Sequence, residues 1–185
     1  MGSTDFIALS ESYNQIDSCL WYGVRFTDSS PKGRRTGNRR MHSALPIQSK
    51  MRGCTINNTD DVIKYLDPEN WSRWEDGTTV TADSSGYTPE YFVEIPEHYR
   101  LLVSTPNNEV EIRLSEYNLP GFEKVPKTYI AAYEAVETAS VPTLLRSVPS
   151  NQSNEYIPTT NITLNLMQAY ARGRNRSKHW NVYTY

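Results

Sequence analysis

The middle of the chain carries three runs in which apolar and polar residues alternate. A period of two puts the apolar side chains on one face of an extended strand, so each run predicts a strand. Pro-Asn-Asn at 106–108, between the last two runs, predicts a tight connection. We therefore expect a β-hairpin or a meander of two or three strands. The apolar positions are Tyr91, Val93 and Ile95, then Tyr99, Leu101 and Val103, then Val110, Ile112 and Leu114.

Shorter apolar patches predict further strands on both sides of these runs. Aromatic and β-branched residues predict one strand over 19–26 and another over 62–66, which ends at Asp67-Pro68. A third strand enters at Tyr129 and ends near Glu134. The strands are consecutive along the chain, which favours an antiparallel sheet.

Three features predict breaks between the strands. Pro46 places the segment 43–57 at a sheet edge or in a loop. Trp71 and Trp74 are three residues apart, which suggests one helical turn. Asp76-Gly77 is typical of a turn.

A single segment near the end of the chain has the pattern of an amphipathic helix. Thr163 or Asn165 supplies the N-cap, and Gly173 ends the helix. The helix would carry one apolar face, formed by Leu166, Ala169 and Tyr170 with Met167 and Ala171 beside it.

These elements divide the chain into three parts. Residues 1–17 are polar and predict a loosely held arm, and 18–122 form a β-rich module. Asn-Leu-Pro-Gly-Phe at 118–122 marks the boundary, after which 123–185 form a separate part. The chain ends on exposed aromatic residues, so we expect it to be a fragment of a longer protein. We also expect 123–185 to pack onto the β-rich module or onto another copy, because a bare apolar patch is rare on a monomer.

Composition supports a β-rich protein with long connections. The 185 residues include 13 Tyr, 4 Trp and 11 Pro, and a net charge of −2 gives no overall attraction to nucleic acid or anionic membrane. No apolar run approaches the about 20 residues that span a bilayer, so we expect no membrane insertion. Cys19 and Cys54 are interpreted as small buried residues from a reducing compartment, and whether they pair is left open.

Two segments are strongly basic although the chain is slightly acidic. One spans 32–40 and the other 172–178. Each is either a solvated surface segment or a contact for phosphate or an acidic glycan. We interpret 32–40 as a surface turn whose charge is solvated or meets a neighbouring subunit, with direct ligand contact as the alternative. The candidate ligand-binding residues are Arg34, Arg35, Arg39 and Arg40, together with Trp71 and Trp74.

Residues suited to catalysis are scattered along the chain. His42, His98 and His179 lie far apart in sequence, and no nucleophile, zinc or nucleotide motif appears. Asp60-Asp61 and Glu75-Asp76 are adjacent pairs, whose side chains point to opposite faces of a strand. We therefore expect a protein that is not an enzyme and has no catalytic residues, metal or cofactor. The abundant Tyr, Trp, Asn and Ser suit a recognition surface instead.

Many short motifs occur in an order that resembles a known family. The order resembles the N-terminal half of phage and prophage tail proteins found with gut bacteria. The resemblance covers most of the chain from Tyr22 onward and rests on the order of the motifs rather than on any one of them. The motifs are 22–26 (YGVRF), 29–31 (SSP), 35–38 (RTGN), His42, 45–54 (LPIQSKMRGC), 62–71 (VIKYLDPENW), 93–100 (VEIPEHYR) and 114–117 (LSEY).

The resemblance implies an α+β, β-rich fold in which an antiparallel module precedes the start of a C-type-lectin-like domain. Residues 123–185 are similar to the opening of this fold in formylglycine-generating enzymes and phage tropism determinants. Tyr129, Ile130, Tyr133 and Glu134 would lie on its first strand, and Met167, Tyr170 and Ala171 on its first helix. The chain ends before the distal loops that would bind ligand, so this domain is expected to be truncated.

The resemblance also implies a role at the virion tail, after assembly in the bacterial cytoplasm. The protein would recognise a bacterial surface receptor, a glycan or a protein, and would contact other tail proteins as a homo-oligomer, commonly a trimer. An enzyme of the formylglycine-generating type is one alternative, although its copper-binding cysteines are not matched. A nucleic-acid-binding protein using 32–40 and 172–178 is the other, and we consider nucleic acid the less favoured partner.

Overall fold

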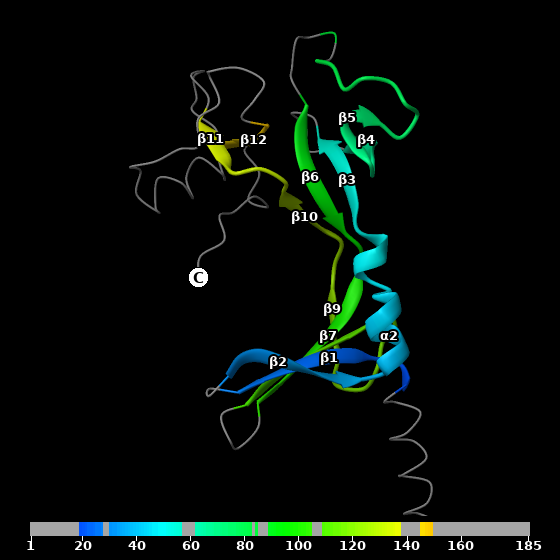
Figure 1. Cartoon of the computed structure of the whole chain (residues 1–185), viewed down its shortest axis with the longest axis vertical. Helices are drawn as coiled ribbons and strands as arrows, with labels where there is room; N and C mark the ends of the chain where they lie inside the picture. Colours follow the sequence, from blue (N-terminus) through cyan, green and yellow to red (C-terminus); the bar gives the residue numbers. More distant parts are fainter. Residues whose placement is uncertain are drawn as a thin grey trace, which may run out of the picture. The chain divides into compact units, whose positions relative to one another are not determined.

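A computed structural model describes residues 19–27, 30–56, 62–82, 84, 89–104, 109–137 and 145–149. These residues form an antiparallel, β-rich protein with two five-stranded sheets and one two-stranded sheet (Figure 1). The chain divides into two compact units, each built from two separate stretches. Unit 1 comprises Met1–Met51 and Ile95–Thr128, and unit 2 comprises Arg52–Glu94 and Tyr129–Tyr185. The stretches of the two units alternate along the chain.

Unit 1 is built on a sheet with the order β2-β1-β8-β7-β9. The hairpin expected from the alternating runs is confirmed, because β7 pairs antiparallel with β8 from Tyr99↔Ser115 to Ser104↔Val110. Strand β1 brings a distant segment alongside, with Val24 opposite Ile112 on β8. The strands are β1 (Tyr22–Thr27), β2 (Ser30–Gly37), β7 (His98–Ser104), β8 (Val110–Ser115) and β9 (Glu123–Val125).

The basic segment 32–40 is regular structure, so the predicted surface turn is wrong. Its first part lies in strand β2, which pairs with β1 through Val24↔Arg35 and Gly23↔Thr36. Its last part begins helix α2 (Arg39–Ala44), which Asn38 caps by accepting hydrogen bonds from the backbone of the first turn. Strand β2 lies at the edge of the sheet, so polar residues occupy both of its faces and no alternation reveals the strand.

A small hydrophobic core lies beside the sheet of unit 1. Trp21, Leu119 and Phe122 are buried together, and Leu20, Tyr99 and Leu101 pack against them. The short helices α2 and η1 (Gln48–Lys50) follow β2, and the hydroxyl of Tyr22 donates a 2.6 Å hydrogen bond to Gln48 Oε1. Leu119 and Phe122 belong to the turn before β9, so this core also holds that turn against the sheet.

Unit 2 is built on a sheet with the order β10-β6-β3-β4-β5. Cys54, Ile56 and Phe92 form its buried core, with Val62, Tyr65 and Tyr129 packed against them. Strand β6 pairs with β3 here, from Arg52↔Glu94 to Ile56↔Glu90, so the first alternating run does not join the hairpin as a third strand of a meander. The strands are β3 (Arg52–Ile56), β4 (Val62–Asp67), β5 (Asn70–Trp74), β6 (Glu90–Ile95) and β10 (Thr128–Ala131), and β11 (Ala135–Glu137) pairs with β12 (Leu145–Ser147).

Two local predictions in unit 2 are wrong and two are confirmed. Residues 52–56 form the central strand of the sheet rather than an edge or loop, because Pro46 lies well before the strand begins. Trp71 and Trp74 lie on β5, not on a helical turn. The strand that ends at Asp67 and the turn at Gly77, whose φ is 82°, are as expected.

Several predictions fall outside the described residues. They concern the arm at 1–17, the connection at 106–108, and everything from 150 onward, including the helix near Leu166 and the basic segment 172–178. Neither Cys19 nor Cys54 forms a disulfide bond in the described structure, and Cys19 is exposed, which corrects the expectation that both are buried. Among the helices that are described, none is long and apolar enough to cross a membrane.

Candidate functional site

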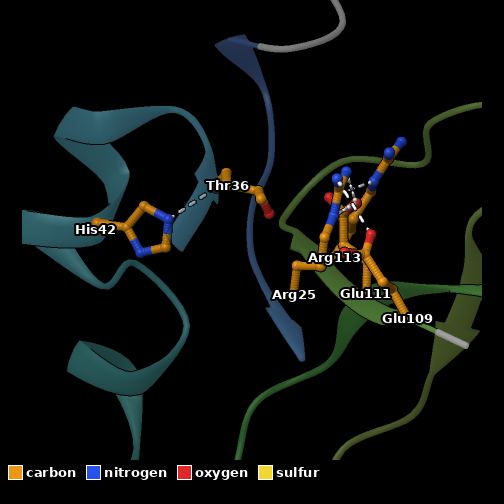
Figure 2. Close-up of polar contacts among 6 residues, drawn as sticks. All are labelled: Arg25, Thr36, His42, Glu109, Glu111 and Arg113. Carbon is orange, nitrogen blue, oxygen red and sulfur yellow. Dashed lines mark hydrogen bonds and ion pairs between the residues drawn. The ribbon is translucent and has the colours of Figure 1, made fainter. Parts of the chain in front are cut away.

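A buried carboxylate, Glu111, lies on β8, the central strand of the sheet of unit 1. It sits on β8 directly opposite Arg25 on β1, and its side chain is only 1% exposed. Arg25 donates to Glu111 Oε2 through Nη2 at 2.7 Å and through Nε at 3.1 Å. Arg113, two residues along β8 on the same face, donates through Nε to Glu111 Oε1 at 3.0 Å. Both carboxylate oxygens are therefore held by guanidinium groups (Figure 2).

The electrostatics of this cluster favour the charged carboxylate. Burial by itself would raise the pKa of Glu111, but the hydrogen bonds from Arg113 and Arg25 outweigh burial and lower this pKa. The same contact raises the pKa of Arg25, chiefly through its hydrogen bond to Glu111. Glu109 adds a second carboxylate 3.6 Å from Arg25 Nη1. The cluster is thus an ion pair network that spans β1 and β8.

Residues on β2 and α2, together with Trp21, lie next to this network. Figure 2 shows Thr36 on β2 between this network and His42 of α2, whose Nε2 donates to the Thr36 carbonyl oxygen at 2.7 Å. The Thr36 hydroxyl oxygen is buried and has no hydrogen-bond partner within the described structure. The Arg113 guanidinium lies 4.3 Å from the centre of the Trp21 ring. Interactions of this kind join strands far apart in sequence, which suits a structural role.

The remaining glutamates of unit 1 are also paired with cations. The described residues of unit 1 contain eleven Lys and Arg but only five Glu and no Asp. All five glutamates form ion pairs. The pairs are Glu97–Lys124, Glu109–Arg25, Glu111–Arg25, Glu111–Arg113, Glu116–Lys50 and Glu123–Arg100. Six of the eleven cations take no part in these pairs, and four of the six are Arg34, Arg35, Arg39 and Arg40; Lys32 and Lys127 make other interactions.

The arginines predicted to bind ligand are among these cations. Arg34 and Arg35 are exposed on β2, and Arg39 and Arg40 are exposed at the start of α2. None of the four forms an ion pair with another described residue. Consecutive residues of a strand face opposite sides, so Arg34 and Arg35 present charge on both faces of the edge strand. We call Lys32–Arg40 the basic edge.

The two predicted tryptophans belong to unit 2 and serve its packing. Trp74 donates from Nε1 to the Thr55 hydroxyl at 3.2 Å, and the Lys64 ammonium lies 4.8 Å from the centre of the Trp74 ring. A Cβ atom added to Gly53 would lie 2.8 Å from the Trp71 ring, so that ring packs against the backbone of β3. Gly53 and Thr55 are two residues apart on β3 and share a face of it, so the structure brings Trp71 and Trp74 to the same side of the sheet. Both side chains are partly exposed there and pack against β3.

Unit 2 holds a second polar cluster that the sequence did not indicate. Glu94 is 9% exposed, and its Oε2 accepts hydrogen bonds from the hydroxyls of Tyr65 at 3.2 Å and Tyr129 at 3.0 Å. Glu94 occupies a polar position between the alternating apolar residues Val93 and Ile95. Both faces of β6 are in fact covered, as Tyr91 and Phe92 are also buried. A pair of tyrosines near a strand glutamate is too common a feature to have been a usable signal.

No comparison relates the chain to a known protein. No family model matches it, and neither the curated proteins nor the solved structures contain a significant match. Within the described ranges, no three His, Cys, Asp or Glu side chains are grouped as metal ligands would be.

Proposed function

We propose that this chain is a structural and host-recognition protein of a phage or prophage tail tip, rather than an enzyme. The observation that carries the proposal is the way the ordered motifs contact one another. Tyr22 of YGVRF donates to Gln48 of LPIQSKMRGC at 2.6 Å. Tyr65 of VIKYLDPENW donates to Glu94 of VEIPEHYR. Within each unit, two of the motifs that carry the resemblance are thus in direct contact, which supports the proposal that they belong to one fold.

An open apolar face in unit 1 supports assembly with other chains. Phe26 is 38% exposed, Val110 44% and Leu102 52%. Phe26 lies opposite Val110, and Leu102 lies opposite Ile112, so all of these side chains share one face of the sheet. Large apolar residues gathered on one face favour contact with another protein. We propose that this face is covered in the assembled tail, in a homo-oligomer or against another tail protein.

The proposed receptor-binding part is a C-type-lectin-like domain that begins near residue 123. Its first strand would correspond to β10, where Tyr129 is tied to Glu94. Further along, the Ser147 hydroxyl donates to the Tyr91 carbonyl oxygen at 2.6 Å, which joins β12 to β6. These contacts give the start of this part a fixed support, which a recognition domain needs.

Binding to host cells tests the proposal. Fluorescently labelled full chain is incubated with the bacterium that carries the gene and with an unrelated gut bacterium. We expect saturable binding to the former, and we expect the chain to compete with adsorption of induced phage particles. Equal binding to both bacteria, or no competition at saturating protein, would contradict host recognition.

A further inference from the structure

The positive charge of unit 1 is concentrated rather than spread. Each glutamate among its described residues is already paired with a cation outside the basic edge. Arg34, Arg35, Arg39 and Arg40 lie close in sequence, are exposed and form no ion pair within the described part of the chain. A solvated face normally mixes both signs of charge, and a cluster of one sign repels itself. Such a cluster is stabilised when a polyanion binds to it.

We propose that the basic edge is a docking surface for an acidic polysaccharide. Four of its five cations are arginines, whose planar guanidinium matches a carboxylate with two parallel hydrogen bonds. Strand β2 is at the end of the sheet order, so its outer edge pairs with no other described strand, and Arg34 and Arg35 are exposed on it. A linear, flexible polymer can lie along such an edge and meet several arginines at once.

The surroundings favour a polysaccharide over nucleic acid. Sites for single-stranded nucleic acid combine positive charge with aromatic side chains on which bases stack. Residues 30–44 contain no Trp, Tyr or Phe, and the one exposed aromatic residue of the neighbouring strand β1 is Phe26, a single ring against Gly33, whereas stacking of successive bases needs several rings. A two-stranded ribbon could enter the major groove of a duplex, but β1 and β2 are part of a five-stranded sheet. The choice of a polysaccharide as the anion rests on the proposed role in host recognition, whereas the anion-binding surface itself rests on the charge distribution.

The tests use the full chain and a polyuronate, polygalacturonate, as the probe. One variant carries Arg34→Gln, Arg35→Gln, Arg39→Gln and Arg40→Gln. The matched control carries Lys50→Gln, Arg52→Gln, Lys64→Gln and Arg100→Gln, which removes the same charge from exposed cations that have carboxylate partners. Circular dichroism establishes that both variants are folded. Biolayer interferometry then measures binding of polygalacturonate, neutral dextran and a thymidine oligonucleotide at two salt concentrations.

We expect wild type and control to bind polygalacturonate, and the basic-edge variant to bind it about tenfold more weakly or not at all. Raising salt from about 50 to 200 mM should weaken wild-type binding by up to roughly 50-fold if four charges are neutralised. An equal loss of polygalacturonate affinity in both variants would mean that binding depends only on net charge, and would overturn the proposal. Equal binding of dextran would overturn it too, and so would no binding of polygalacturonate. Binding of the oligonucleotide at least as tight as that of polygalacturonate would make nucleic acid the partner instead. If polygalacturonate binds but host cells do not bind the chain, only the role in host recognition fails.

Discussion

Replacing Glu111 with glutamine removes the buried negative charge on β8 while keeping the shape of the side chain. The variant leaves the guanidiniums of Arg25 and Arg113 facing each other across a neutral amide. Glu109 remains, but its carboxylate is 3.6 Å from Arg25 Nη1, farther than the 2.7 Å contact that Glu111 supplies. The network would therefore lose its strongest charge contacts in the folded state.

The expected cost follows from how deeply the partners are buried. Breaking a fully buried ion pair typically costs about 3–5 kcal/mol, because a charge is left uncompensated. Glu111 is 1% exposed, but the side chains of Arg25 and Arg113 are 30% and 26% exposed and can regain some water. We therefore expect the free energy of unfolding to fall by about 1–3 kcal/mol for Glu111→Gln. For a chain of this length, a loss of about 2 kcal/mol lowers the melting temperature by roughly 4–8 °C.

Thermal and urea unfolding of the two proteins measure this difference. Glu123→Gln is the matched control, because its pair with Arg100 has side chains 61% and 42% exposed and should be worth about 0–1 kcal/mol. A Glu111→Gln variant as stable as the Glu123→Gln variant would refute the reasoning, because the buried ion pairs would then stabilise the fold no more than the exposed one.

The pH dependence of stability gives an independent check on the same residue. The folded pKa of Glu111 lies below its unfolded value, so its stabilising contribution is present above the unfolded pKa of about 4.3 and is lost as the pH falls through the folded pKa. Wild type should lose stability over this acidic range, and Glu111→Gln should lose less. Parallel stability profiles for the two proteins below pH 5 would contradict the lowered pKa.

Two further predictions follow from backbone geometry and burial. Gly37→Ala should destabilise the protein more than Gly77→Ala. Both residues have positive φ (76° and 82°), but only at Gly37 would the new Cβ meet the Trp21 ring, at 2.5 Å. Urea unfolding measures both variants, and equal losses of stability would show that the clash with Trp21 has no effect. Cys19 should react with a thiol reagent in the folded protein, whereas Cys54, which is 0% exposed, should react only after unfolding. Equal rates of modification of the two thiols in native buffer would contradict the burial of Cys54.

The strands with clear alternation were predictable, and those that depend on distant partners were not. The runs at Tyr99 and Val110 formed the expected hairpin because their pairing is local. The run at Tyr91 has the same pattern, yet it pairs with β3 from a distant part of the chain. Periodicity shows that a segment is extended but contains no information about its partner, so the sorting of strands between two sheets was out of reach.

The candidate site was predictable in its residues but not in its structure. The density of arginines in 32–40 was visible, whereas the strand that presents them was not, because an edge strand exposed on both faces has no apolar period. Glu111 and Glu94 occupy polar positions of alternating strands, and nothing in the sequence marks them as buried. Their ionic and hydrogen-bond partners Arg25 and Tyr129 come from distant segments of the chain, which a local pattern does not report.

The location of the protein in a phage particle tests the central claim most directly. Particles are induced from the bacterium that carries the gene, purified by density gradient and labelled with gold-conjugated antibody against the chain. Electron microscopy should show gold at the tail tip, and mass spectrometry of the same fraction should detect peptides of the chain. Purified particles without these peptides, or gold confined to the capsid, would contradict a role in host recognition at the tail.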